Sequence, residues 1–304
     1  MSLILISLYY YVCDCYDSQL RYQVQRFSPN KLEGEITDEE LLTIYLYCVG
    51  YQEKTNLKSM HTYIQDHWLS YFPKLPAYQT FVGRINRMSD LFEPLINQLI
   101  HDLRQASAEQ YDMDAAFLLL DSMPIITCSG KREGKVAPDL TGKSFCATKN
   151  LWYYGVKFHL LSQKQPARLP LPYACGITPA YVHDLKASRW VLSALKDKVI
   201  FADKAYADQI LENQLLISQN VELITPIKTP KATPKVIEQR EKAYNKAFSS
   251  AVSSIKQPIE SFFAWLHEKT KIQFASKVRS HIGLRVHVFG KFAAALCLLL
   301  HFNP

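Results

Sequence analysis

Two short apolar runs in the second half of the chain each end in an aspartate. The first, AAFLLLD, covers residues 115–121 and ends in Asp121, and the second, VIFAD, covers residues 199–203 and ends in Asp203. Continuous apolar runs of this length are typical of strands buried on both faces of a sheet. A buried carboxylate is costly unless it is paired, hydrogen-bonded or bound to a cation. We therefore expect neighbouring strands whose two carboxylates lie close together around a cation.

The segments around these runs predict a mixed sheet with helices packed on it. Further strands are expected over residues 153–161, 171–178 and 221–227, and helices over 184–195 and 206–218, followed by basic helical segments. Strands in succession, then strand and helix in alternation, indicate an α/β fold. With 304 residues, 48% of them hydrophobic, the chain is long enough for two domains. We expect a helical domain over residues 1–110 and an α/β domain over 111–304.

The first domain reads as helical throughout. Thr37 and Glu40 form a capping box in front of an apolar run, and an apolar stretch at the N-terminus predicts a core helix. A later short helix carries polar and basic side chains that suit a helix-turn-helix-like DNA reader. A plain helical bundle with surface arginines fits the same pattern. The residues expected to contact DNA are Tyr78, Gln79, Arg84 and Arg87.

Composition and charge indicate a reduced cytoplasmic protein with a polyanionic partner. The seven cysteines are odd in number and include no CxxC pair. Residues 227–291 hold 13 Lys and Arg against four acids, a net charge of +9 in a chain whose total is +7. Such clustering favours nucleic acid, although a solvated helix face is the plainer explanation. The C-terminal run at 292–302 is too short to span a bilayer, so we expect a packing helix and no membrane contact.

A third carboxylate lies within the basic segment. Glu260, in the stretch KQPIESFFAWL, is isolated among neutral and cationic side chains, and with Asp121 and Asp203 it would complete a site for two divalent ions. Each acid also has a structural explanation. Asp121 suits a turn cap, Asp203 can pair with a neighbouring base, and Glu260 can pair with Lys256 four residues earlier.

These three acids, in LLLDSMPI, IFADKAYAD and KQPIESFFAWL, resemble the D, D and E of the DDE transposases of bacterial insertion sequences. The stretches EITDEELLTIYLY, WLSYFPKLPAYQTFVGRINRM and ITPAYVHD resemble one such family of small elements. The resemblance implies a ribonuclease H-like domain that uses Mg²⁺, with Mn²⁺ as a substitute. It also implies a cytoplasmic, nucleoid-associated enzyme that binds transposon-end and target DNA as a homodimer or larger assembly.

The resemblance also assigns roles to single residues. Asp121 and Asp203 would hold one metal ion, and Asp121 and Glu260 the other, for cleavage and strand transfer by in-line displacement. The Tyr-Arg-Glu-Lys signature of related elements is degenerate here, because Ser253, Lys256 and His267 stand at its Tyr, Arg and Lys positions.

Further DNA contacts are expected around the site. Residues 129–150 form a glycine-containing basic segment that suits a mobile phosphate clamp, or equally a solvated loop. Trp152, Trp190 and Trp265 could stack on an extruded base, with core packing the alternative for Trp190. His183 and Asp184 suit support of the metal ligands, and Asp184 equally suits a helix N-cap. The residues expected to bind DNA here are Lys131, Arg132, Lys135, Lys256, His267 and Lys271.

Two other functions remain open from the sequence. A metal-dependent nuclease that cuts DNA without joining strands would need the same three acids. A DNA-binding protein without catalytic activity would use the basic segment alone and leave the acids structural. Metal binding that depends on Asp203 separates the last function from the others, and a joined DNA product separates the transposase from the nuclease.

Overall fold

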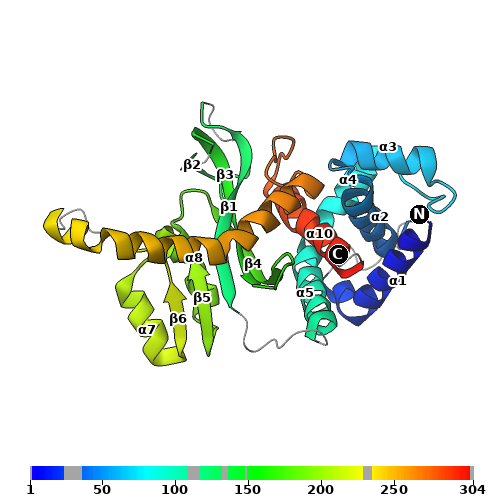
Figure 1. Cartoon of the computed structure of the whole chain (residues 1–304). Helices are drawn as coiled ribbons and strands as arrows, with labels where there is room; N and C mark the ends of the chain where they lie inside the picture. The colour runs from blue at the N-terminus through cyan, green and yellow to red at the C-terminus, as the bar shows by residue number, and fades with distance from the viewer. Residues whose placement is uncertain are drawn as a thin grey trace. The chain divides into compact units, whose positions relative to one another are not determined.

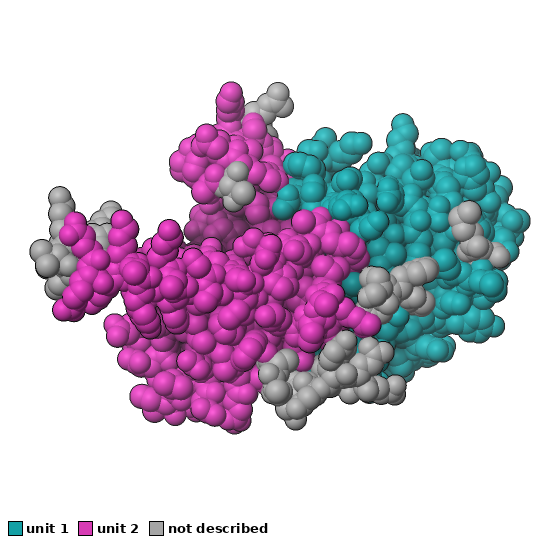
Figure 2. Space-filling view, in the orientation of Figure 1, with its two compact units in different colours: residues 1–107, 135–139, 266–304 teal, residues 108–134, 140–265 magenta. Residues whose placement is uncertain are grey.

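The chain divides into two compact units in a computed structural model (Figures 1 and 2). The structure describes residues 2–23, 36–108, 117–131, 136–147, 149–228 and 235–301. Unit 1 comprises residues 1–107, 135–139 and 266–304, and unit 2 comprises residues 108–134 and 140–265. The expected single domain over 111–304 differs from this division, because residues 266–304 cluster with the N-terminal helices.

Unit 1 is helical in its described part. Its helices are α1 (Ser2–Ser18), α2 (Asp38–Gln52), α3 (Leu57–His67), α4 (Tyr78–Arg87), α5 (Phe92–Ala108), α9 (His281–Arg285) and α10 (Lys291–His301). Short turns of helix complete it: η1 (Leu20–Tyr22), η2 (Ser89–Leu91) and the π-helical η4 (Val286–Gly290). The capping box before α2 is confirmed, because Thr37 Oγ1 accepts from the Glu40 N–H and Glu40 Oε2 accepts from the Thr37 N–H.

Helices α2 and α10 form the centre of unit 1. Every residue of α2 from Leu41 to Gly50 is buried, as in a helix that is apolar all round. A side chain at Gly50 would come within 3.1 Å of a backbone oxygen of α10, so this glycine allows the two helices to approach closely. The stretch His281–Leu300 is long and apolar enough to cross a membrane, yet 72% of its most apolar window is buried within the protein. That burial fits the expected packing helix.

Unit 2 contains a six-stranded mixed sheet. Its strands are β1 (Leu118–Ser129), β2 (Gly142–Cys146), β3 (Leu151–Gln163), β4 (Leu171–Pro179), β5 (Lys198–Ala202) and β6 (Val221–Ile224). The order is β2-β3-β1-β5-β6, with β4 also paired to β3. β3 is antiparallel to β1, β2 and β4, whereas β5 is parallel to β1 and β6. This is the ribonuclease H-like mixed sheet expected for the second half of the chain.

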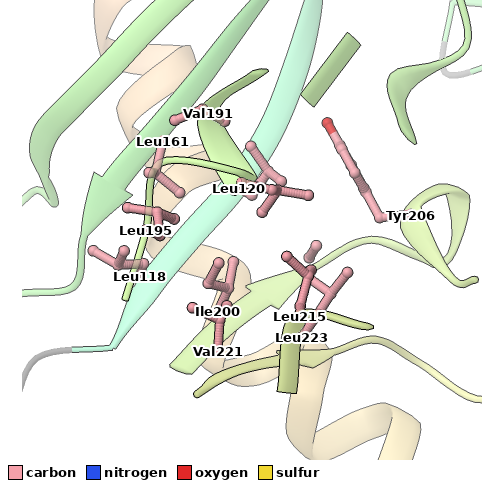
Figure 3. Close-up of a cluster of buried hydrophobic side chains, with 12 residues drawn as sticks. Leu118, Leu120, Leu161, Val191, Leu195, Ile200, Tyr206, Leu215, Val221 and Leu223 are labelled. Carbon is pink, nitrogen blue, oxygen red and sulfur yellow. The ribbon is translucent and has the colours of Figure 1, made fainter. Parts of the chain in front are cut away.

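Helices cover both faces of this sheet. One face carries a core of leucines and other apolar residues from β1, β5 and β6, which packs with α6 (Asp184–Leu192) and α7 (Gln209–Gln219) and includes Tyr206 from η3 (Lys204–Tyr206) (Figure 3). The long helix α8 (Lys235–Thr270) runs across the sheet (Figure 1), and its Lys256 reaches the side chain of Asp121 on β1. The last residues of α8, from Leu266, belong to unit 1.

Two strand predictions need correction. We expected the first strand to end at Asp121, but β1 continues to Ser129, because it stays paired with β3 after its pairing with β5 ends at Leu120. We also expected a loop throughout residues 129–150, but residues 142–146 form β2 along β3. The segment 228–235, expected to be a flexible connection, lies outside the described residues except for its two ends, Lys228 and Lys235.

Candidate active site

The parallel pairing of β1 and β5 brings the two aspartates together. The last paired residues are Leu120 and Ala202, so Asp121 and Asp203 each follow the final rung of the ladder. Alternation along the strands puts both side chains on the face opposite the α6 and α7 core, which is the face that α8 crosses. The prediction that the two strands would bring these carboxylates close together is correct, although Asp121 lies within β1 and not at its end.

Lys256 of α8 lies between all three predicted carboxylates. Its Nζ is 3.1 Å from Asp121 Oδ2, 3.7 Å from Asp203 Oδ1 and 3.7 Å from Glu260 Oε1. Glu260 lies one helical turn after Lys256, so both point toward the sheet from the same stripe of α8. The expected pair between Lys256 and Glu260 is present, and the same ammonium also joins the two strands.

The site is buried at one end and open at the other. The side chain of Lys256 is 6% exposed and that of Asp121 is 16% exposed, whereas Asp203 and Glu260 are 56% and 63% exposed. Burial raises the pKa of Asp121, and the Lys256 ammonium and the Ser122 N–H, at 2.8 Å, oppose this rise. Burial by itself would lower the pKa of Lys256, but the surrounding carboxylates raise it. The ammonium therefore keeps its charge and offsets the mutual repulsion of the acids.

A polar network on the opposite face of the sheet supports the strand that carries Asp121. Ser122 Oγ donates to Asp184 Oδ1 at 2.9 Å, and Lys157 Nζ donates to the same oxygen at 3.1 Å. Asp184 is the first residue of α6 and does not cap it, because His183 is the N-cap. Tyr206 is buried, and burial together with Asp184 and Asp121 raises the pKa of its hydroxyl. Ser122, the residue after Asp121, is thus held in place by Asp184. The sequence does not predict that Lys157 and Tyr206 take part in this network.

The residues expected to read DNA on α4 have mixed environments. Tyr78 and Gln79 are exposed at the start of the helix, and Arg87 is exposed near its end. Arg84 is mostly buried and donates to the Asp38 carboxylate at the start of α2, so it has a structural partner within unit 1. The connection from α3 to α4 covers residues 68–77, which is longer than the three- or four-residue turn of a helix-turn-helix.

The other expected DNA contacts are dispersed. Lys131 is exposed just after β1, whereas Arg132 and Lys135 lie outside the described residues. His267 and Lys271 belong to unit 1, where His267 packs edge-on against the ring of Phe274, 5.1 Å away, and Lys271 is exposed. Among those expected DNA-binding residues that the structure describes, only Lys256 lies within the carboxylate cluster.

The family of the chain follows from its sequence. A model of the transposase DDE domain matches residues 112–298, which is more than half of the chain and includes all three carboxylates. The chain belongs to the DDE transposase family. The protein is therefore an enzyme of DNA transposition whose substrate is DNA, in a family that uses divalent metal ions. Searches of curated proteins and of solved structures found no match.

The residues of this transposase fit a divalent cation in their chemistry. Carboxylate oxygens are the protein ligands that Mg²⁺ and Mn²⁺ prefer, and here oxygens of three carboxylates already surround a single cationic group. Within the described residues, no three His, Cys, Asp or Glu side chains lie close enough to hold one ion in the present arrangement. The positive charge in the cluster is that of Lys256.

Proposed function

We propose that this protein is the transposase of a bacterial insertion sequence and that Asp121, Asp203 and Glu260 are its catalytic acids. The observation that supports this most strongly is the convergence of these three carboxylates on Lys256, from two adjacent strands and one helix. Bringing three carboxylates together costs free energy through their mutual repulsion, so we take their convergence as a sign that the protein uses the negative charge. A cation bound by these acids, which we propose to be Mg²⁺, would activate the attacking oxygen and stabilise the leaving one.

The chain's own groups prepare this site for DNA. Asp121 is held by the Ser122 N–H and lies at the buried end, so its position is fixed before any ligand arrives. Asp203 and Glu260 are more than half exposed, so the open side of the cluster can receive a DNA backbone. Lys256 balances the acids, and we propose that its ammonium, 3.7 Å from each of the two exposed carboxylates, also contacts a phosphate oxygen of DNA.

DNA recognition is proposed to use both units. Tyr78, Gln79 and Arg87 are exposed on α4 and suit contact with the transposon ends, whereas Arg84 would act by fixing α4 to α2. Lys131 and Lys271 are exposed, as phosphate contacts require. We retain Arg132, Lys135 and His267 as proposed contacts on sequence grounds, and we also propose assembly of two or more copies to hold two DNA ends. All seven cysteines are free thiols, which supports a cytoplasmic location at the nucleoid.

The test of this function is a cleavage and joining reaction. Purified protein, Mg²⁺, linear DNA carrying the coding segment with its native flanks, and supercoiled plasmid are combined. We expect cut ends covalently joined to plasmid. Asp203→Asn should abolish both steps while keeping DNA binding, whereas Glu222→Gln, an exposed acid on β6, should behave as wild type. Cutting without joining would indicate a nuclease, and normal activity of Asp203→Asn would refute the assignment of the site.

A further inference from the structure

An exposed patch of aromatic rings lies on β2 and the start of β3, far along the sheet from the carboxylates. Its members are cross-strand neighbours, because Phe145 pairs with Trp152 and Lys143 pairs with Tyr154. Side chains of directly paired residues point to the same face of an antiparallel sheet. We call Lys143, Phe145, Trp152 and Tyr154 the aromatic face. These strands lie at the end of the sheet that projects at the top of Figures 1 and 2.

The aromatic face is turned to solvent although its composition suits a core. Trp152 is 57% exposed and Phe145 is 45% exposed, and their ring centroids are 5.4 Å apart. On the other face of the same strands, Tyr153 is 2% exposed and Gly142 is buried beneath the ring of Tyr181. A sheet with one buried face normally places polar side chains on its outer face. Contiguous exposed aromatic residues instead mark a binding surface.

Positive charge accompanies the rings. Lys143 Nζ lies 5.7 Å from the ring centre of Trp152 and 5.9 Å from that of Tyr154, so its ammonium is held at the aromatic surface. The charged residues in the described parts of 129–154 are Lys131, Lys143 and Lys149, with Asp139 the single acid. Rings that stack on bases, beside lysines that attract phosphates, are the combination with which proteins bind single-stranded nucleic acid.

The aromatic face is on the same side of the sheet as the catalytic cluster. Asp121 pairs with Leu160 of β3, and the alternation along β3 from Leu160 through Phe158 and Val156 reaches Tyr154 and Trp152. The register irregularity between β1 and β3 occurs where β1 passes from Ile126 to Cys128, so it does not interrupt β3. Eight residues of strand separate Trp152 from Leu160, about 26 Å along β3. A strand whose bases stay stacked at the duplex rise of ~3.4 Å would cover that length with about eight nucleotides.

We propose that the aromatic face binds unpaired bases of a DNA strand that passes through the active site. Trp152 and Phe145 stack on the bases, and Lys143 contacts the phosphate between them. This inference rests on the proposed function, because its ligand is the DNA that the transposase acts on. It adds a second contact with that same DNA. A strand freed from its complement near the cut would then be held away from the intact duplex.

The test measures DNA binding in EDTA, so it does not depend on cleavage. The probes are a fluorescein-labelled duplex and the same duplex with an eight-nucleotide single-stranded extension, and fluorescence anisotropy gives their dissociation constants. Trp152→Ala should weaken binding of the extended probe by roughly 5- to 150-fold and leave the plain duplex unchanged. Trp152→Phe keeps a ring and should bind within about twofold of wild type. Trp190→Ala is the matched control, because Trp190 is 53% exposed on α6.

Three further readouts keep the proposal falsifiable. Lys143→Gln should reduce the salt dependence of extended-probe binding by about 0.7 in the log–log slope, the value for one phosphate on a single strand. Equal weakening of both probes by Trp152→Ala, or equal effects of Trp152→Ala and Trp190→Ala, would overturn the proposal. A change of oligomeric state in Trp152→Ala, measured by light scattering, would also overturn it by making the face a protein interface. Glu222→Gln, at an exposed acid on β6 outside the site, should bind both probes as wild type. Because binding is measured in EDTA, its outcome is independent of the cleavage test of the catalytic acids.

Discussion

Replacing Lys256 by Met tests how the carboxylate cluster is held together. Lys256 and Asp121 form a mostly buried pair at 3.1 Å, and removal of one partner of such a pair costs about 3–5 kcal/mol, because it leaves an uncompensated charge. Asp203 and Glu260 are more than half exposed, so each of their pairs with Lys256 adds only about 0.2–1 kcal/mol. We take about 3 kcal/mol as the expected loss, because Asp121 keeps the N–H of Ser122.

The assay is thermal unfolding with and without Mg²⁺. In metal-free buffer, Lys256→Met should lower Tm by roughly 6–12 °C, at about 2–4 °C per kcal/mol. The control is Lys246→Met, an exposed lysine on the same helix, which should change Tm little. A divalent cation that binds the folded state raises stability by mass action, and without the ammonium it meets no competing charge. Mg²⁺ should therefore raise Tm more in Lys256→Met than in wild type. Two results would refute this explanation. One is an equal rise in Tm on adding Mg²⁺ to Lys256→Met and to wild type, and the other is a Tm of Lys256→Met in metal-free buffer that equals that of Lys246→Met.

Two further predictions concern stability. Burial lowers the pKa of His159 to about 4 and that of His287 to about 3, so both imidazoles are neutral in the folded protein. Below pH 6.5, the ordinary pKa of histidine, the unfolded chain binds protons at these residues that the folded protein does not bind. The free energy of unfolding should therefore fall as the pH drops. Measured by urea unfolding, its decrease between about pH 7 and about pH 5 should be about 2 kcal/mol smaller in His287→Gln than in wild type. The same pH dependence in both proteins would contradict this. A side chain at Gly290 would come within 2.7 Å of the ring of Tyr45, so Gly290→Ala should cost about 1–3 kcal/mol. Gly83→Ala on α4, with nothing closer than 3.9 Å, should stabilise by about 0.5–1 kcal/mol, and the opposite order of Tm would refute the packing argument.

The sequence predicts those parts of the fold that local pattern encodes. The apolar runs before Asp121 and Asp203 form the expected neighbouring strands, and the capping box at Thr37 begins α2 as expected. In contrast, β2 contains only one large apolar residue, Phe145, and it is a strand because β3 offers an unpaired edge. Similarly, the apolar C-terminal run indicates a packing helix but does not indicate its partner, which is α2 within unit 1.

The sequence predicts the three acids of the candidate site, but it does not predict that the ammonium of Lys256 lies between them. Charge isolation in a basic segment is a local signal and points to Glu260, and the position directly after an apolar run does the same for the two aspartates. The role of Lys256 depends on α8 crossing the sheet, which is a long-range arrangement, so sequence spacing indicates only its pair with Glu260 four residues later. The anchoring of Ser122 by Asp184 likewise joins residues 62 positions apart, and no periodicity encodes such a pair.

The most direct test of the central claim is Mn²⁺ binding to the DNA-free protein, followed by electron paramagnetic resonance of the free ion. Asp203→Asn and Glu260→Gln should each weaken Mn²⁺ binding by at least ~10-fold relative to wild type. The matched control is Asp208→Asn, because Asp208 caps α7 through the N–H groups of Ile210 and Leu211, and Asn caps a helix equally well. A metal site formed by these carboxylates requires unchanged Mn²⁺ binding in this control and weakened Mn²⁺ binding in the other two variants. Mn²⁺ binding that survives both Asp203→Asn and Glu260→Gln would contradict it.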